Sequence, residues 1–140
     1  MPSANSLPEI KRLADARYGS GTFKMLLVSS APSESDLDTF SFRSAVTNEV
    51  APSGTYASGG AAVTCTVGSP DTALNRVPVT FGSPATWTGT TISAVGGWIY
   101  KVIGTAGTDE LVTYVDFGGT ISSTSGPFTA SAAAPLYVNR

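Results

Sequence analysis

The chain has 140 residues, of which only 13 % are charged, and its formal net charge is −2. This length fits one compact domain, and the weakly acidic balance gives no attraction for nucleic acid or an anionic membrane, so we expect neither as a partner. Because the chain has no histidine and one cysteine, we expect no enzymatic activity, no cofactor and no bound metal, and a role in binding or assembly instead.

The first predicted element is a helix from Ser6 to Tyr18. Ser6 and Glu9 have the spacing of a capping box, and Pro8 is tolerated in the first turn. One narrow apolar stripe is formed by Leu7, Ile10, Leu13 and Ala14. A helix this short is marginal alone, so it docks on its own domain or on a neighbour. We hypothesise that residues 1–18 dock on a neighbouring subunit, and we divide the chain into an arm (1–20) and a β-domain (21–140).

The start of the chain carries no targeting signal that we recognise. Residues 1–5 lack the basic start and apolar core of a signal peptide, and no apolar run approaches transmembrane length. We therefore expect synthesis in the cytoplasm and no membrane association.

Residues 23–60 combine one clear strand with less regular segments. The continuous apolar run 23–29 predicts a strand, and the turn-forming residues 31–36 predict a loop. Residues 38–50 fit either a helix or a strand, and we interpret them as a short helix. The Gly/Ser-rich stretch 51–60 predicts another loop.

From residue 61 onwards, short strands follow one another about every ten residues, separated by Gly-, Ser- and Pro-containing turns. The predicted strands are 62–67, 76–81, 92–95 leading into 98–103, 111–117, 128–131 and 136–138. Turns are predicted at 68–71, 82–84, 118–119 and 125–127. Pro78 indicates an edge strand or a bulge, and Cys65 is interpreted as a small buried hydrophobe. This pattern predicts a mainly β fold, a jelly-roll-like antiparallel β-sandwich with a short N-terminal helix.

Residues 97–116 predict a β-hairpin that is apolar on both faces. Trp98 and Tyr100 alternate with Ile99, and in the second strand Leu111 alternates with Val112. A strand pair with two apolar faces needs a cover on both sides. We expect the rest of the sandwich on one face and a partner protein on the other.

Two groups of residues could carry a ligand or a reaction. The acidic pairs Asp36/Asp38 and Asp109/Glu110 lack the spacing of a glycosidase or a calcium loop, so we interpret them as solvated turn residues. Five aromatic residues could form a sugar-binding platform, although they serve equally as core residues or interface anchors. These are Trp87, Trp98, Tyr100, Tyr114 and Tyr137.

The order of several short motifs carries a resemblance to a known family. The motifs are Phe23-Lys-Met-Leu-Leu-Val-Ser-Ser, Thr47-Asn-Glu-Val with Gly54-Thr-Tyr-x-x-Gly-Gly-Ala61, Val79-Thr-Phe, Thr90-Thr-Ile-Ser-Ala94, Ile99-Tyr-Lys101 and Tyr114-Val-Asp-Phe-Gly118. In this order the chain resembles small structural proteins of tailed bacteriophages, some of which are cement, or decoration, proteins. The resemblance implies a jelly-roll virion protein on the outer surface of the phage head that clamps neighbouring capsid subunits and brings no catalytic residues.

The resulting hypothesis is a head cement protein that binds the major capsid protein and stabilises the icosahedral shell. A tail- or fibre-associated virion protein and a carbohydrate-binding β-sandwich module are the alternatives. We also expect self-association, as a homodimer or else a trimer. The expected interface residues are Leu7, Ile10, Leu13, Trp87, Tyr100 and Tyr114.

Overall fold

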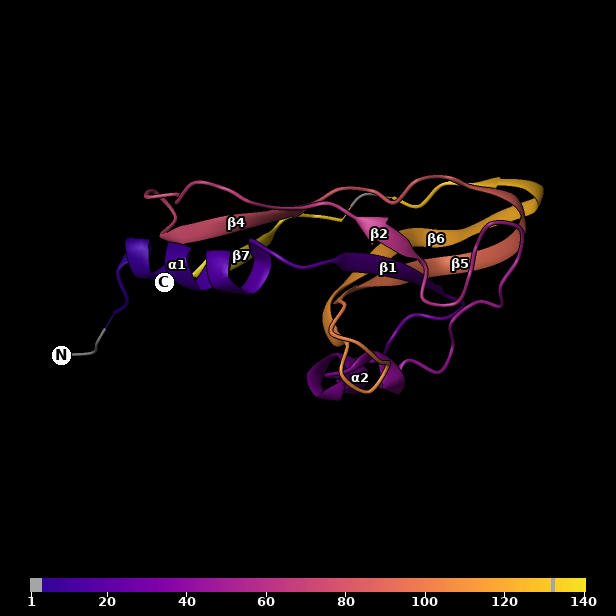
Figure 1. Ribbon diagram of the computed structural model, residues 1–140, viewed down its shortest axis with the longest axis horizontal. Helices are drawn as coiled ribbons and strands as arrows, with labels where there is room; N and C mark the ends of the chain where they lie inside the picture. Colours follow the sequence, from indigo (N-terminus) through magenta and orange to yellow (C-terminus); the bar gives the residue numbers. More distant parts are fainter. Residues whose placement is uncertain (1–3, 132) are drawn as a thin grey trace.

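The computed structural model describes residues 4–131 and 133–140 and shows a mainly β protein (Figure 1). Its elements are α1 (Leu7–Tyr18), β1 (Phe23–Val28), α2 (Glu34–Thr39), the 3-10 turn η1 (Arg43–Ala45), β2 (Ala61–Val63), β3 (Cys65–Val67), β4 (Arg76–Phe81), β5 (Trp87–Lys101), β6 (Glu110–Phe128) and β7 (Leu136–Asn139). All strand pairs are antiparallel. The predicted class, antiparallel β-structure with a short N-terminal helix, is confirmed.

The strands form two sheets, one of four strands in the order β2-β1-β5-β6 and one of three in the order β3-β4-β7. Alternate side chains of β1, including Phe23, pack into a core with Val79 and Phe81 of β4. The rings of Phe23 and Phe81 lie 5.7 Å apart at a steep angle, which is a favourable aromatic geometry. This arrangement is consistent with a β-sandwich, whereas the jelly-roll connectivity stays a prediction.

The two longest strands, β5 and β6, correct the predicted boundaries. The segments 92–95 and 98–103 belong largely to one strand, and β6 runs for 19 residues through both predicted turns at 118–119 and 125–127. Gly118 and Gly119 adopt positive φ angles of 78° and 157°. The register shifts here, from Gly96 opposite Asp116 to Ala94 opposite Ile121. The two glycines therefore form a bulge within a continuing strand.

The predicted strand 62–67 divides at Thr64. The part before it, β2, pairs with β1 in the four-stranded sheet, and the part after it, β3, pairs with β4 in the other. Thr64 accepts a backbone hydrogen bond from Gly82 at 2.9 Å. A Cβ at Gly82 would lie too close to the Thr64 hydroxyl, so a glycine allows the close approach of the two segments where the chain changes sheets.

The prediction of an edge strand or a bulge at Pro78 is wrong, because β4 is the middle strand of its sheet. The Pro78 carbonyl accepts a hydrogen bond from the N–H of Gly68, which directly follows the last residue of β3. The proline therefore stands where β3 ends. Its missing N–H removes little from the pairing of β4.

Helix α1 packs on the protein's own sheet, and the hypothesis that residues 1–18 also dock on a neighbouring subunit stays a prediction. Ser6 accepts a hydrogen bond from the Glu9 N–H at 3.3 Å, as its capping position predicts. Ile10 and Ala14 are buried against Val77 of β4. At the other end, Arg17 pairs with Glu110 of β6 at 2.6 Å. Residues 1–3 of the hypothesised arm lie outside the described residues.

The segment 31–50 also differs from its prediction. Helix α2 begins in the predicted loop 31–36 and ends in the predicted helix 38–50, and a capping box between Ser33 and Asp36 stabilises its N-terminus. Apart from the end of α2 and the 3-10 turn η1, residues 38–50, predicted as a helix, are irregular, and Glu49 forms an isolated antiparallel bridge with Val28. The capping residues Ser33 and Asp36 set the position of this helix. The apolar spacing that predicted a helix at residues 38–50 did not set it.

Candidate interaction site

The second face of the long hairpin is covered by the chain itself. Leu26 and Val28 of β1 and Trp98 and Tyr100 of β5 form a second apolar cluster. Partly buried side chains that pack on this cluster include Phe40, Val46, Val102, Leu111 and Tyr114. A partner protein is therefore not needed to cover this face. The cover belongs to a lobe, defined here as residues 34–46 with the loop 102–109, that projects below the four-stranded sheet (Figure 1).

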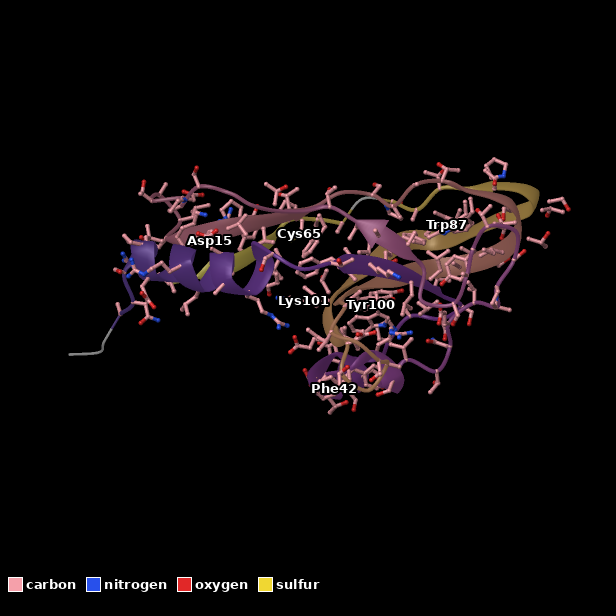
Figure 2. All side chains as sticks on the ribbon, viewed as in Figure 1. Asp15, Phe42, Cys65, Trp87, Tyr100 and Lys101 are labelled. Carbon is pink, nitrogen blue, oxygen red and sulfur yellow. The ribbon has the colours of Figure 1, made fainter. Side chains whose placement is uncertain are left out.

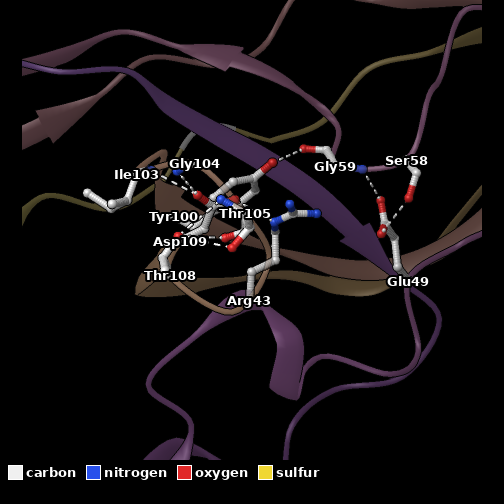
Figure 3. A network of polar contacts seen from close by, with 10 residues as sticks. All are labelled: Arg43, Glu49, Ser58, Gly59, Tyr100, Ile103, Gly104, Thr105, Thr108 and Asp109. Carbon is white, nitrogen blue, oxygen red and sulfur yellow. Dashed lines mark hydrogen bonds and ion pairs between the residues drawn. The ribbon is translucent and has the colours of Figure 1, made fainter.

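Asp109 holds the two parts of this lobe together (Figure 3). Its carboxylate accepts hydrogen bonds from the N–H groups of Ile103 at 2.8 Å and Gly104 at 3.0 Å. It also accepts one from Nε of Arg43 at 2.9 Å. Asp109 is only 2 % exposed. Its interpretation as a solvated turn residue is therefore wrong, because each carboxylate oxygen has a donor inside the protein.

These contacts also set the charge of the Asp109 side chain. Burial raises the pKa of Asp109, but the hydrogen bonds from Gly104, Ile103 and Arg43 outweigh burial and hold the pKa below its usual value. The carboxylate is thus ionised at neutral pH and neutralises the Arg43 guanidinium. Two backbone hydrogen bonds also join the two parts of the lobe. They run from Arg43 N–H to the Asp109 carbonyl and from Ser44 N–H to the Ala106 carbonyl, both at 2.9 Å.

Arg43 and Tyr100 link the lobe to the loop 51–60. The Arg43 guanidinium lies over the ring of Tyr100, 5.1 Å from its centre. The Tyr100 hydroxyl donates to the carbonyl of Gly59 at 2.5 Å, and Glu49 accepts from the Gly59 N–H at 2.6 Å. Burial, partly offset by Arg43, raises the pKa of Tyr100, so the phenol stays protonated and keeps this donor. The base of the lobe is therefore a connected polar network.

Beyond this polar network, the surface of the lobe carries three exposed apolar side chains. Leu37, Phe42 and Ile103 are 48 %, 44 % and 55 % exposed. Phe42 forms a backbone bridge with Glu110, and Ile103 donates its N–H to Asp109. Figure 2 shows Phe42 on the lobe, below the four-stranded sheet. The backbone that carries two of these three side chains is thus fixed by the network and its neighbours.

The six residues expected at an interface are not brought together. Three of them, Ile10, Trp87 and Tyr100, are at least 95 % buried inside the protein and present no surface to a partner. Leu7 and Tyr114 are partly buried, and Leu13 is half exposed on α1. Sequence reasoning missed the exposed residues of the lobe, because Phe42 lies in a segment interpreted as a helix, Ile103 lies at the end of a predicted strand, and Leu37 lies between a predicted loop and that helix. The available signal for these exposed residues was that each is an isolated apolar residue close to turn-forming residues in the sequence.

The aromatic residues do not assemble a surface platform for a sugar. Trp87, Trp98 and Tyr100 are buried, and Trp87 packs at a steep angle on Tyr56, with ring centres 5.2 Å apart. An open groove of about 420 Å³ does exist between residues 49–53 and 91–93. It is lined by small polar or aliphatic side chains and by Glu49, whose carboxylate already accepts from Gly59 and Tyr56.

Within residues 4–131 and 133–140, no group of three or more Cys, Asp or Glu side chains is placed to hold a metal ion. In the same part of the chain no helix has the length and apolar character needed to cross a membrane. Comparisons with protein families, with curated proteins and with solved structures find no match to this chain.

Proposed function

We propose that this protein is a head decoration protein of a tailed bacteriophage, which binds the major capsid protein and stabilises the shell. The order of its sequence motifs supports this proposal through the resemblance described above. The structural observation that carries it is the lobe, in which exposed Leu37, Phe42 and Ile103 stand on a base braced by buried Asp109.

Such a lobe suits a rigid surface as its partner. Ordering a flexible side chain or loop on binding costs about 0.5–1.5 kcal/mol for each side chain immobilised. Phe42 and Ile103 avoid part of this cost because their backbone is already held by Glu110 and Asp109. A shell presents many equivalent sites, and contacts by many copies reinforce one another. Modest apolar contacts per copy are then enough to stabilise the assembly.

The proposal predicts that Phe42→Ala weakens binding to purified shells by about 30-fold, since truncating an aromatic anchor commonly costs about 2 kcal/mol. The matched control is Leu74→Ala, which removes a 58 % exposed side chain in the turn before β4, outside the lobe. Binding is measured by co-sedimentation with shells in low salt and in about 0.5 M salt, where exposed ion pairs are screened. An equal loss with Leu74→Ala, or a loss of wild-type binding with salt alone, would contradict a lobe that binds through apolar contacts.

Copy number in the virion tests the location of the protein. A decoration protein approaches the copy number of the capsid protein, whereas a tail or fibre protein is present in a handful of copies. Quantitative mass spectrometry of purified virions that contain this protein measures the ratio. A ratio of a few copies per virion would replace the head proposal with the tail alternative.

A further inference from the structure

Strand β6 leaves one long edge of the four-stranded sheet without a neighbour in the described residues. It is the last strand in the order β2-β1-β5-β6, and it is 19 residues long. Only its start is covered, by the bridge between Phe42 and Glu110 and the bond from Leu111 N–H to the Ser41 carbonyl. Beyond Leu111, every backbone pairing found for β6 within residues 4–131 and 133–140 is with β5.

The other sheet edges are much shorter. The edge strands β2 and β3 have three residues each, and β7 has four. An added strand forms hydrogen bonds in proportion to the length it can follow, so β6 offers by far the largest gain.

Beyond the bulge at Gly118-Gly119, the stretch 120–126 of β6 lacks the charged residues and prolines that keep edges apart. The only charged residues of the whole strand β6 are Glu110, which pairs with Arg17, and Asp116, which accepts the Gly118 N–H at 2.8 Å. Residues 120–126 are Thr-Ile-Ser-Ser-Thr-Ser-Gly, with neither a charge nor a proline. Thr120, Ser122 and Thr124 of this stretch are exposed. Lysine, proline, inward-pointing charges and bulges are the usual protection of an edge. The bulge at Gly118-Gly119 is present in β6, but no lysine, proline or charged residue lies between residues 117 and 126.

We infer that β6 pairs with β6 of a second copy, antiparallel and centred near Ser122, and joins two four-stranded sheets into one. Pairing about Ser122 sets Thr120 opposite Thr124, and the stretch 120–124 that pairs beyond the Gly118-Gly119 bulge carries no acidic side chain. No two acidic side chains then face each other, so the edge is compatible with itself in charge.

The same geometry fixes the number of copies at two. Antiparallel pairing of identical edges is two-fold symmetric and uses the β6 edge of both copies, so the assembly closes as a dimer. Of the two assemblies expected from the sequence, this pairing favours the homodimer over the trimer. It also places the contact on a different surface from either expected one, because Pro78 lies in a middle strand and the outer hairpin face is covered.

The test is Ser122→Lys in the full chain, measured by sedimentation equilibrium over a concentration series. Two lysines near the symmetry axis repel, and we expect the dimer to dissociate about five- to tenfold more readily than the wild type. The matched control is Ser93→Lys on the same face of β5, directly opposite Ser122 in the register. Both variants lose the same bond, from Ser93 Oγ to Ser122 Oγ at 2.9 Å, so only the distance from the edge differs. The control should dimerise like the wild type.

Cross-linking supplies a second measurement that does not depend on a weakened variant. In a Cys65→Ser background, which removes the chain's only cysteine, Ser122→Cys should form a covalent dimer on mild oxidation and Ser93→Cys should not. A wild-type protein that remains monomeric up to about 100 μM, or a dimer equally sensitive to both lysines, overturns the inference. It is also overturned if the wild type is monomeric and Ser122→Lys alone abolishes shell binding, because β6 would then receive a strand of the capsid protein.

Discussion

Replacing Asp109 with alanine is expected to lower the free energy of unfolding by about 3 kcal/mol, because removing one partner of a buried ion pair leaves the other without compensation. The change deletes the acceptor of three hydrogen bonds, from Ile103, Gly104 and Arg43. The Arg43 side chain is 23 % exposed and recovers some hydration, so the loss stays near the lower end for such pairs. Urea unfolding of both proteins at neutral pH measures it.

The control for this change is Asp36→Ala, which removes an exposed carboxylate from the capping box of α2. It is expected to cost about 1 kcal/mol, the usual value of a cap. If both variants lose the same stability, or if Asp109→Ala unfolds at the wild-type urea concentration, Asp109 does not brace the lobe. Asp109→Ala should also weaken shell binding in proportion to the disorder that it causes in the lobe. This effect would link the polar network around Asp109 to the proposed function.

Asp109 also predicts how stability depends on pH. The hydrogen bonds hold the folded-state pKa of Asp109 below its value in the unfolded chain, which is about 3.9. Stability from this group is therefore fully present above the unfolded pKa, and it is lost as pH falls through the folded pKa. Asp109→Asn lacks a titrating group at this position. The stability difference between wild type and Asp109→Asn should be constant near pH 7 and shrink below pH 4, and a difference that grows on acidification would contradict the assignment.

Gly60→Ala is expected to destabilise the protein by about 3 kcal/mol or more, which is among the larger effects of single substitutions. Gly60 directly precedes β2 and adopts a φ of 76°, a left-handed conformation that is costly for alanine. A Cβ at this position would also overlap the carbonyl oxygen of Met25 in β1. The backbone of β2 would have to move away, which breaks the pairing of Ala61 with Met25.

Gly107→Ala is the matched control for Gly60→Ala. An added Cβ at Gly107 meets no atom within 4 Å. The control is expected to change the free energy of unfolding by less than about 0.5 kcal/mol, as surface substitutions usually do. Thermal and urea unfolding of the two variants compare them directly. Equal stability of Gly60→Ala and the wild type would show that β2 does not need a glycine at its start.

Much of the local structure follows from the sequence alone. The Ser6 cap and the apolar stripe indicated α1, and its boundaries agree with them. The continuous apolar run at 23–28 and the short apolar runs at 76–81 and 98–101 indicated strands, and these strands exist. Caps and alternation are local signals, since they depend on neighbours one to four residues away. The mainly β class and the small number of helices could therefore be predicted without tertiary information.

Partners far apart in sequence could not be predicted in this way. Residues 62–67 read as one strand, yet β2 and β3 pair in different sheets. Gly118-Gly119 reads as a turn, yet in the long hairpin these glycines form a bulge, because positive φ angles serve both structures. The apolar outer face of the hairpin was correctly read as needing a cover, but an alternating pattern does not name the segment that covers it.

The candidate site depends most on the tertiary structure. Asp109 beside Glu110 in a turn has the sequence of a solvated pair, and its burial depends on Arg43, which lies 66 residues away. The exposure of Phe42 and the burial of Tyr100 follow from where the lobe closes against β5. An apolar residue shows by its type that it can be buried, but only the packing of distant segments decides which apolar residues are left on the surface.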